Sequence, residues 1–339
     1  MFVVYGAGAV GLVVGARLAS AGLPVLLVTR RPEAARQIRD LGVRIEDPST
    51  GQVLEQRVAT VCGIEAAAEQ IGSQPVLFCM RSPDTAAAAR ALAAVAPQAA
   101  VASLQNDVDN EEWLAARFAR VIGGCVRQTS TRTADNSAMC IGSGRIVLGT
   151  WPSKQAPDVD APGVDAPGVD ELAGALRRTG YDVGVSTQIL EDKWLKLCVN
   201  LMSAPNALIR REDHATRAFV ELKAQLLEEA RAVLIAAGIH ARSCDGRDRS
   251  LEQEIAHQRE SLALGTSARR LPIYNQVWAA LRHGGPVEAD RYHRRVLELA
   301  DAHGIPAPRN ARVLEALERA VRDARGPEGL GAEELLASA

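Results

Sequence analysis

The chain has 339 residues, a length that predicts two domains at about 100–200 residues each. Its 39 basic and 41 acidic residues give a net charge of −2, which argues against a non-specific nucleic-acid binder. No apolar run reaches the roughly 18 residues that span a bilayer, and Met1–Gly6 lacks the basic segment of a signal peptide. We therefore expect a cytoplasmic protein that binds neither nucleic acid nor membrane.

The first part of the chain alternates short β-rich runs with alanine-rich helical patterns, which predicts βαβ units around a parallel sheet. We expect strands at Phe2–Tyr5, Val25–Thr29, Val76–Met80, Ala100–Leu104 and Val121–Cys125. We expect helices at Val10–Ala21, Pro32–Leu41, Ile64–Ile71, Pro83–Val95 and Glu111–Phe118. The runs Val43–Glu46 and Val53–Val61 have no helix between them and predict a small hairpin. Met139–Ile141 and Arg145–Gly149 continue the β character toward the edge of the domain.

A five-residue repeat follows at residues 156–170, with proline and aspartate in every copy. Such a sequence forms neither a packed helix nor a paired strand, so we expect a solvated loop at 155–170 that is neutral to function. A helix at Glu171–Thr179 and a strand at Tyr181–Thr187 return the chain to the first domain. Only helical patterns remain after about residue 188, at Ile189–Ser203, Thr216–Ala237, Leu251–Leu262, Glu288–His303 and Asn310–Asp323. The predicted fold is an α/β domain over residues 1–188 and an all-α domain over residues 189–339.

The first expected strand leads into a glycine-rich turn, Gly6-Ala7-Gly8-Ala9-Val10-Gly11, which opens the first expected helix. This is the context in which GxGxxG binds a dinucleotide in a Rossmann-type domain. Gly6 permits the tight turn, Gly8 lets the backbone approach the pyrophosphate, and Gly11 allows close helix–strand packing. The N–H groups at the helix N-terminus then bind the negative charge. The alternative is a turn that merely joins a strand to a helix.

The second expected strand is followed by Arg30 and Arg31, with no carboxylate before Glu33. A site for NAD usually places Asp or Glu here, whereas a site for NADP places Arg near the 2′-phosphate. The sequence therefore predicts NADPH as cofactor, with Arg30 on the phosphate and Arg31 stacked on the adenine. The alternative is a pair of ordinary surface arginines.

The six cysteines and six histidines are dispersed singly, with no CxxC, HxH or HxxxH pair. Zinc ligands usually come in close pairs, and disulfide scaffolds are short secreted chains. We therefore expect neither a metal site nor disulfides.

Four blocks of the sequence, spread over nearly its whole length, form a further pattern. The blocks are the glycine loop with Arg30, Leu104-Gln105-Asn106, Lys193-Trp194-Leu195-Lys196-Leu197-Cys198-Val199-Asn200, and Gly284-Gly285-Pro286-Val287-Glu288-Ala289-Asp290 with Gly304-Ile305-Pro306 and Pro308-Arg309-Asn310 downstream. Together they resemble the ketopantoate reductase (2-dehydropantoate 2-reductase) family. The third block is the most specific of these signals. The resemblance implies a Rossmann-type domain joined to a helical domain, with NADPH giving hydride to the ketone carbon of a 2-oxo acid.

The resemblance also implies a role for each polar residue of these blocks. Lys196 is similar to the family's general acid, and an ammonium near the carbonyl oxygen would stabilise negative charge and supply the proton. Asn200 lies at i+4 from Lys196, on the same helix face, where its amide can hold the substrate. Glu288 resembles a glutamate that contacts the substrate, and Asn106 an asparagine near the nicotinamide. Arg81 stands among the cofactor-binding residues where the family commonly has lysine.

Each of these residues also has a simpler interpretation. Lys196 could be an ordinary solvated lysine, and Asn106, followed by Asp107, could only form a turn. Glu288 could be an acidic residue that the helix dipole favours in a first turn. Asn200 lies in an apolar run, where an amide is costly unless it is hydrogen-bonded, so a buried network is the alternative to a site.

Five positions depart from the family pattern, and most of them fall in the expected substrate pocket. They are Arg81 for lysine, Asp107 for glycine, Ala204 for a second asparagine, Gln276 for a serine that binds the substrate carboxylate, and Ala280 for an aspartate. Losing an asparagine and a serine should remove several hydrogen bonds, each worth roughly 0.5–1.5 kcal/mol. The parts for hydride transfer are thus kept, whereas the parts for substrate choice are altered.

The sequence therefore predicts an NADPH-dependent reductase of a small 2-oxo acid, with ketopantoate, the substrate in pantothenate biosynthesis, as first candidate. Ala204 and Gln276, counted with the substrate-binding positions, leave open a larger or less polar carbonyl substrate. A non-catalytic NADP-binding sensor is the alternative of another class. The amphipathic helices of the second domain could form the interface of a homodimer.

Overall fold

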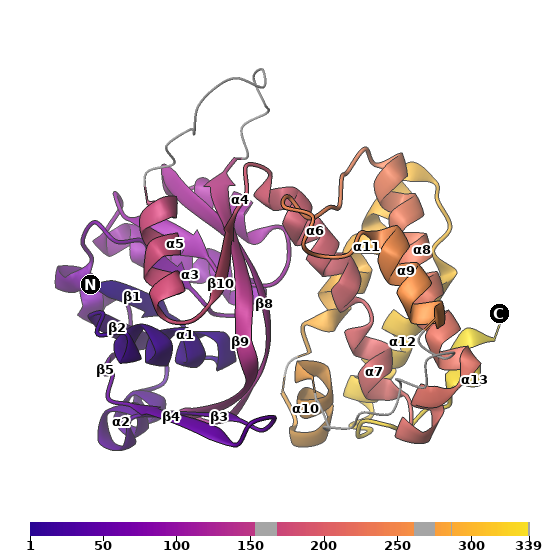
Figure 1. The fold of residues 1–339 in the computed structure, drawn as a ribbon, viewed down its shortest axis with the longest axis horizontal. Helices are drawn as coiled ribbons and strands as arrows, with labels where there is room; N and C mark the ends of the chain where they lie inside the picture. The colour runs from indigo at the N-terminus through magenta and orange to yellow at the C-terminus, as the bar shows by residue number, and fades with distance from the viewer. Residues whose placement is uncertain (153–167, 261–274, 286, 338–339) are drawn as a thin grey trace. The chain divides into compact units, whose positions relative to one another are not determined.

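The computed structural model describes residues 1–152, 168–260, 275–285 and 287–337, which form two compact units, Met1–Leu190 and Glu191–Ala339. Most of the loop expected at residues 155–170 lies outside the described residues, as does the end of the helix expected at Leu251–Leu262. The first unit is α/β and the second is helical (Figure 1), so the predicted fold class is confirmed.

The described part of the first unit is built on a ten-stranded sheet. Its strands are β1 (Phe2–Tyr5), β2 (Val25–Thr29), β3 (Val43–Asp47), β4 (Gln52–Gln56), β5 (Ala59–Cys62), β6 (Val76–Phe78), β7 (Ala100–Ser103), β8 (Arg120–Ala134), β9 (Ser137–Trp151) and β10 (Asp182–Val185). Their order is β4-β3-β9-β8-β7-β6-β1-β2-β5, and β10 pairs with β9. All neighbours from β8 to β5 are parallel, so the carboxyl ends of β7, β6, β1 and β2 meet at one edge of the sheet.

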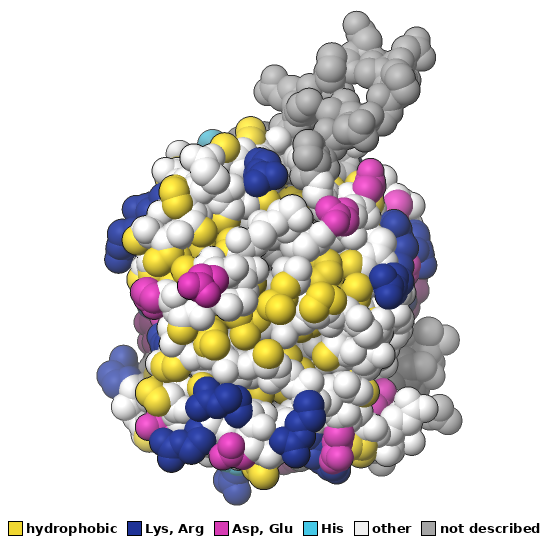
Figure 2. Space-filling model, turned by 90° about the vertical axis from the view of Figure 1, so that its left-hand side faces the viewer, with side chains coloured by type: hydrophobic (Ala, Val, Ile, Leu, Met, Phe, Trp, Pro, Cys, Tyr) yellow, Lys and Arg dark blue, Asp and Glu magenta, His cyan; other side chains and the backbone are white. Residues whose placement is uncertain are grey.

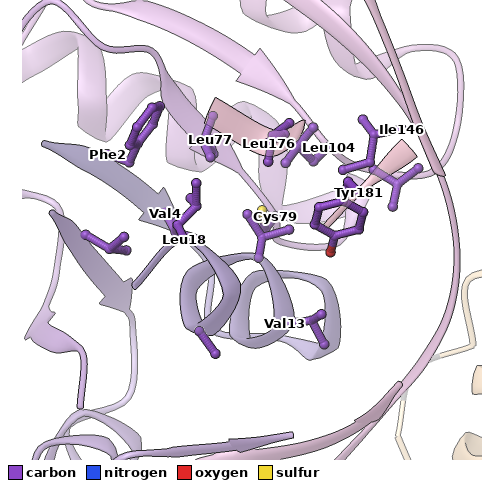
Figure 3. Close-up of a cluster of buried hydrophobic side chains, with 14 of the residues drawn as sticks. Phe2, Val4, Val13, Leu18, Leu77, Cys79, Leu104, Ile146, Leu176 and Tyr181 are labelled. Atoms are coloured by element: carbon purple, nitrogen blue, oxygen red, sulfur yellow. The ribbon is translucent and has the colours of Figure 1, made fainter. Parts of the chain in front are cut away.

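Helices cover both faces of this sheet. They are α1 (Ala9–Ser20), α2 (Pro32–Leu41), α3 (Thr85–Val95), α4 (Asn110–Ala115) and α5 (Val169–Arg178), with 3-10 turns η1 (Glu65–Gln70) and η2 (Ser82–Asp84). On one face, Val13 and Leu18 of α1 share a buried cluster with Val4 and Leu77 of the sheet (Figure 3). The opposite face has its own cluster, in which α3 and α4 pack against β1 and β6. Both clusters are mainly aliphatic, as the 4% aromatic content requires.

The expected hairpin is correct for β3 and β4, which pair antiparallel, but wrong for its last residues. The chain leaves the hairpin at Arg57, whose guanidinium donates to the carbonyls of Arg39 and Asp40 at 3.0 and 2.6 Å. The residues beyond it form β5, which pairs with β2 instead.

The two β runs expected near the domain edge form one continuous strand, β9, in a long hairpin with β8. The glycines that separate the two runs, Gly142 and Gly144, have positive φ values of 67° and 78°. They lie where the register between β8 and β9 shifts, so they form an irregularity within the strand rather than its end.

The second unit consists of helices in its described part. They are α6 (Ile189–Asn200), which begins in the first unit, α7 (Ser203–Leu208), α8 (Arg217–Ala236), α9 (Leu251–Glu260), α10 (Gln276–His283), α11 (Ala289–His303), α12 (Pro308–Arg322) and α13 (Ala332–Leu336), with the 3-10 turn η3 (Arg211–Ala215). The long helix α8 packs against α9, α11, α12 and α13. The short helices α7, α10 and α13 were not expected, because five to eight residues carry too little periodicity to be recognised.

Charged side chains are unevenly distributed on one face of the first unit. Figure 2 shows a face of the first unit on which hydrophobic side chains gather in the middle, whereas Lys and Arg gather toward the lower end, the level of α2 in Figure 1. Among the described residues, no helix is both long and apolar enough to cross a membrane.

Candidate active site

The glycine loop joins β1 to α1, and two of its three glycines are required by the protein itself. Gly6 has a φ of +110°, and a Cβ there would lie 2.6 Å from the Met80 backbone nitrogen. A Cβ on Gly11 would lie 1.9 Å from the Gly6 carbonyl oxygen. A side chain at Gly6 would therefore clash with the backbone that follows β6, and one at Gly11 would push α1 away from the Gly6 turn.

Gly8 differs from both, because the protein leaves room for a side chain there. Its φ of −83° suits any residue, and the nearest atom to an added Cβ is the Cys79 carbonyl oxygen at 3.7 Å. Gly8 is also the N-cap of α1, whose first turn contains no acidic residue. The neighbouring Ala7 and Ala9 are buried and Val10 is half-buried, so small side chains line the loop. This open backbone at a helix N-terminus fits the pyrophosphate of a dinucleotide.

The arginines expected to bind the cofactor fall into two groups. Arg30, after β2, and Arg81, after β6, both contact the Asp84 carboxylate, at 3.1 and 3.5 Å. Arg31 instead contacts Asp135, in the turn between β8 and β9. Arg30 and Arg81 thus meet at the edge of the sheet that carries the glycine loop, whereas Arg31 pairs elsewhere.

A buried polar network holds the segments that follow β6 and β7. The Gln105 amide donates to the Met80 carbonyl at 3.0 Å and to the Thr85 hydroxyl at 2.6 Å, and Thr85 donates to Asn110 Oδ1 at 2.8 Å. The network continues when Asn110 Nδ2 donates to Ser82 Oγ at 3.1 Å, and Ser82 in turn donates to the Asn106 carbonyl at 2.9 Å. These bonds fix the backbone of Asn106 and of the loop carrying Arg81.

Asp107, the departure next to Asn106, keeps the backbone that a glycine would give. Its φ of +77° lies in the left-handed region, which glycine adopts most readily and Asp tolerates better than most residues. Its carboxylate is buried and accepts from the Val108 N–H at 2.8 Å. This local bond stabilises the turn, and the φ of Asp107 is one that a glycine would also adopt.

Lys196 and Asn200 lie one turn apart on α6 and have some solvent access. The side chains around Lys196 on this helix, from Asp192 to Cys198, are otherwise buried. The Asn200 carbonyl accepts from Ser203 Oγ at 2.6 Å, which joins α6 to α7. A lysine and an amide thus come together at an accessible stripe of a helix that is mostly buried.

The remaining expected substrate residues also lie in the second unit. Gln276, exposed, is the first residue of α10, and Asn275 before it donates to the Ser203 carbonyl at 2.7 Å, so the beginnings of α10 and α7 meet. Ala204 in α7 is fully buried. Glu288 is the N-cap of α11, and the Tyr292 hydroxyl lies 3.5 Å from its carboxylate.

Helix α11 packs on α6, which brings the helices of Glu288 and Lys196 together. The Arg295 guanidinium of α11 lies 5.8 Å from the centre of the Trp194 ring of α6. Asn310, the last residue of the fourth block, is structural: it is buried and hydrogen-bonds His293 at 2.9 Å, Leu226 at 3.2 Å and Glu229 at 2.9 Å.

Several residues of the site were missed from the sequence. Asp84, Thr85 and Asn110 hold the arginines and the Asn106 loop, and Tyr292 contacts Glu288. Only the position of Asp84 and Thr85, just after a strand at the carboxyl edge of the sheet, could have drawn attention to them. Among the described residues, no three His, Cys, Asp or Glu side chains gather as a metal site would require.

The parallel strands from β8 to β5, the open Gly8 and the added helical unit define a Rossmann-type dinucleotide-binding protein. Two family models match, ketopantoate reductase PanE/ApbA over residues 2–153 and its C-terminal domain over residues 188–320. The chain therefore belongs to the ketopantoate reductase PanE/ApbA family and is a 2-dehydropantoate 2-reductase-like oxidoreductase. Enzymes of the family use a nicotinamide cofactor.

Curated and solved relatives match nearly full length. The 2-dehydropantoate 2-reductase of Halobacterium salinarum is 26% identical over 326 residues, which are 95% of this chain and 99% of that protein. A PanE/ApbA family ketopantoate reductase structure from Ralstonia eutropha has a TM-score of 0.72 at 24% identity, covering 96% of this chain and all of that chain. The ternary structure of D-mandelate dehydrogenase with NADH and anilino(oxo)acetate has a TM-score of 0.77 at 17% identity, with the same coverage. These two structural likenesses show the fold.

Proposed function

We propose that the chain reduces a 2-oxo acid with NADPH, and that 2-dehydropantoate (ketopantoate) is converted to pantoate. The observation that carries this proposal is the pair Lys196 and Asn200, which have solvent access on one face of the otherwise buried helix α6. The family membership and the activity named for the Halobacterium relative support the same reaction. Such a reaction belongs to pantothenate biosynthesis, and a homodimer stays a prediction that sedimentation can test.

The first unit supplies the groups that fit the cofactor. The N-terminus of α1 and the open backbone at Gly8 would bind the pyrophosphate, and Arg30 and Arg81 the 2′-phosphate. Arg31 would have to leave Asp135 to lie on the adenine, and Asn106 would lie near the nicotinamide. NADPH supplies the hydride when it is bound.

The second unit supplies the groups that act on the substrate. The Lys196 ammonium holds the proton that the carbonyl oxygen receives, and its charge stabilises the negative charge that develops there. Asn200, one turn away, orients the substrate through its amide. The Glu288 carboxylate, which Tyr292 contacts, would bind the substrate hydroxyl.

A second candidate substrate is a larger or less polar 2-oxo acid. Gln276 is exposed at the start of α10, where a longer amide replaces the serine of the family pattern, and Ala204 is buried without a polar group. The likeness to the D-mandelate dehydrogenase structure that contains anilino(oxo)acetate makes a 2-oxo acid with an aromatic group the first to test.

The test is NADPH oxidation with ketopantoate beside a panel of aliphatic and aryl 2-oxo acids. The proposal expects the highest kcat/KM with ketopantoate, whereas a preference for aryl acids selects the second candidate. NADPH binding with no turnover of any 2-oxo acid would instead support the sensor alternative and refute both enzyme proposals.

Replacing Lys196 tests its role as proton donor. Lys196→Ala should lower kcat by about 10²–10⁴, the usual contribution of general acid catalysis, and leave the Kd for NADPH within about twofold. Lys196→Arg is the matched control, because guanidinium keeps the charge but does not release a proton near neutral pH. In Lys196→Arg, the KM for the 2-oxo acid should be closer to the wild-type value than kcat is. Unchanged kcat in Lys196→Ala would show that the proton comes from another group.

A further inference from the structure

One carboxylate lies between Arg30 and Arg81, the two arginines proposed above to bind the 2′-phosphate. Asp84 Oδ1 lies 3.1 Å from Arg30 Nη1, and Asp84 Oδ2 lies 3.5 Å from Arg81 Nη2, so each oxygen meets a different guanidinium. Arg30 follows β2 and Asp84 lies in the turn after β6, and both strands pair with β1. The contact between Arg30 and Asp84 therefore reaches across the strand that leads into the glycine loop.

The local structure does not explain why an aspartate stands at this position. Asp84 is the N-cap residue of α3, but its side chain makes no capping hydrogen bond. The Arg30 side chain is 71% exposed and the Asp84 side chain 32%. Ion pairs this exposed contribute about 0–1 kcal/mol to stability, so the carboxylate is not needed to hold the fold.

The position of this carboxylate matches a known element of cofactor recognition. In dinucleotide-binding folds, a carboxylate at the end of the second strand accepts a hydrogen bond from the ribose 2′-hydroxyl of NAD, and an arginine there accommodates the phosphate of NADP. The residues after β2 lack that carboxylate, but Asp84 brings one to Arg30 from the end of β6. The same place therefore holds groups for both cofactors.

We propose that Asp84 determines how strongly the enzyme prefers NADPH over NADH, an inference that rests on the proposed cofactor site. With NADH, the carboxylate accepts from the adenosine ribose 2′-hydroxyl, so that NADH also serves as reductant. With NADPH, the 2′-phosphate accepts hydrogen bonds from Arg30 and Arg81 in place of Asp84. The displaced Asp84 carboxylate then repels the phosphate, because both are negatively charged. Asp84 thus raises the affinity for one cofactor and lowers the affinity for the other.

The test is the replacement Asp84→Asn, with Kd measured by fluorescence titration for both cofactors. Removing one negative charge beside the phosphate should tighten NADPH binding about three- to tenfold, and losing the charged acceptor should weaken NADH binding by about the same factor. The ratio of the two Kd values then changes about ten- to hundredfold. A general disturbance of the site would move both constants in the same direction.

Glu55→Gln is the matched control. It removes one exposed carboxylate, which pairs with Arg44. Glu55 lies on β4, at the opposite end of the sheet order from β2 and β5. This variant changes the net charge equally and should leave both Kd values unchanged.

Arg30→Ala separates failure of this inference from failure of the proposed cofactor site. Suppose that Arg30→Ala weakens the binding of NADPH much more than that of NADH. If Asp84→Asn then changes both Kd values in the same direction, or changes neither, Asp84 does not affect the cofactor preference and only this inference is overturned. If Arg30→Ala leaves the preference unchanged, the assignment of the phosphate site itself is wrong.

Discussion

The three glycines of the loop lead to a prediction that separates folding from cofactor binding. A Cβ at Gly11 would lie 1.9 Å from the Gly6 carbonyl oxygen and 3.2 Å from the Cys79 Cβ, so α1 would have to move by more than an ångström. At Gly8 the nearest atom is 3.7 Å away, which is ordinary contact. Gly11→Ala should therefore destabilise the protein, and Gly8→Ala should chiefly impair binding.

The magnitudes follow from these distances. Overpacking of this kind costs about 1–3 kcal/mol or more, offset by roughly 0.5–1 kcal/mol because alanine is the better helix former. A net loss of about 2 kcal/mol lowers Tm by about 4–8 °C in a domain of the size of the first unit, Met1–Leu190. Gly8→Ala should stay within about 0.5 kcal/mol of the wild type, because small cap and chain-entropy effects oppose each other. Gly8→Ala should still weaken the binding of NADPH at least about tenfold, since the methyl group would occupy the place proposed for the pyrophosphate.

Thermal unfolding and fluorescence titration with NADPH measure the two effects. Gly174→Ala is the control, because Gly174 lies within α5 and no atom lies within 4 Å of a Cβ added there. This variant should neither weaken the binding of NADPH nor lower Tm. If Gly8→Ala binds NADPH as the wild type does, the pyrophosphate does not approach Gly8 and the assignment of the loop is refuted. A Tm for Gly11→Ala equal to that of the wild type would refute the packing argument.

Two further predictions concern stability. At Asp107 the φ of +77° favours glycine, so the variant Asp107→Gly should be more stable than Asp107→Ala by about 1 kcal/mol. Thermal unfolding of the two variants measures this difference, and equal stabilities would mean that the turn relaxes in Asp107→Ala. Burial lowers the pKa of His293 to about 4, below its ordinary value of 6.5, so between these pH values the unfolded chain binds more protons than the folded one. The free energy of unfolding should therefore fall on acidification through this window, by up to about 1.4 kcal/mol per pH unit from this residue. Urea unfolding at pH 7.5 and pH 5 should show a smaller difference for His293→Gln than for the wild type, and an identical difference would exclude His293 as the cause.

The elements that the sequence predicts well are those with local causes. The strand β1, the glycine loop and α1 are contiguous, and the three glycines report directly on the turn and on helix–strand contact. Lys196 and Asn200 were placed on one helix face by their spacing alone. The family pattern supplied the chemistry for them, because a lysine in a helix has no distinctive local signature.

Contacts between distant segments could not be predicted in the same way. Asp84 reaches Arg30 from 54 positions away, and only the strand order β6-β1-β2 makes this contact possible. The bonds of Thr85 with Gln105 and Asn110 likewise join segments that follow different strands. A single sequence contains no periodicity that reports such pairs. It shows that the end of β2 lacks a carboxylate, but not that Asp84 brings one to Arg30.

The structure also changes how the departures from the family pattern should be weighed. Asp107 keeps the left-handed backbone of the glycine it replaces, and Ala204 has no solvent-accessible surface. Gln276 is exposed at the first position of α10, where a side chain is free to meet a substrate. A long amide in place of a short hydroxyl changes both the reach and the donor geometry at that point. If the enzyme prefers a substrate other than ketopantoate, Gln276 is therefore, of these three departures, the one most able to cause it.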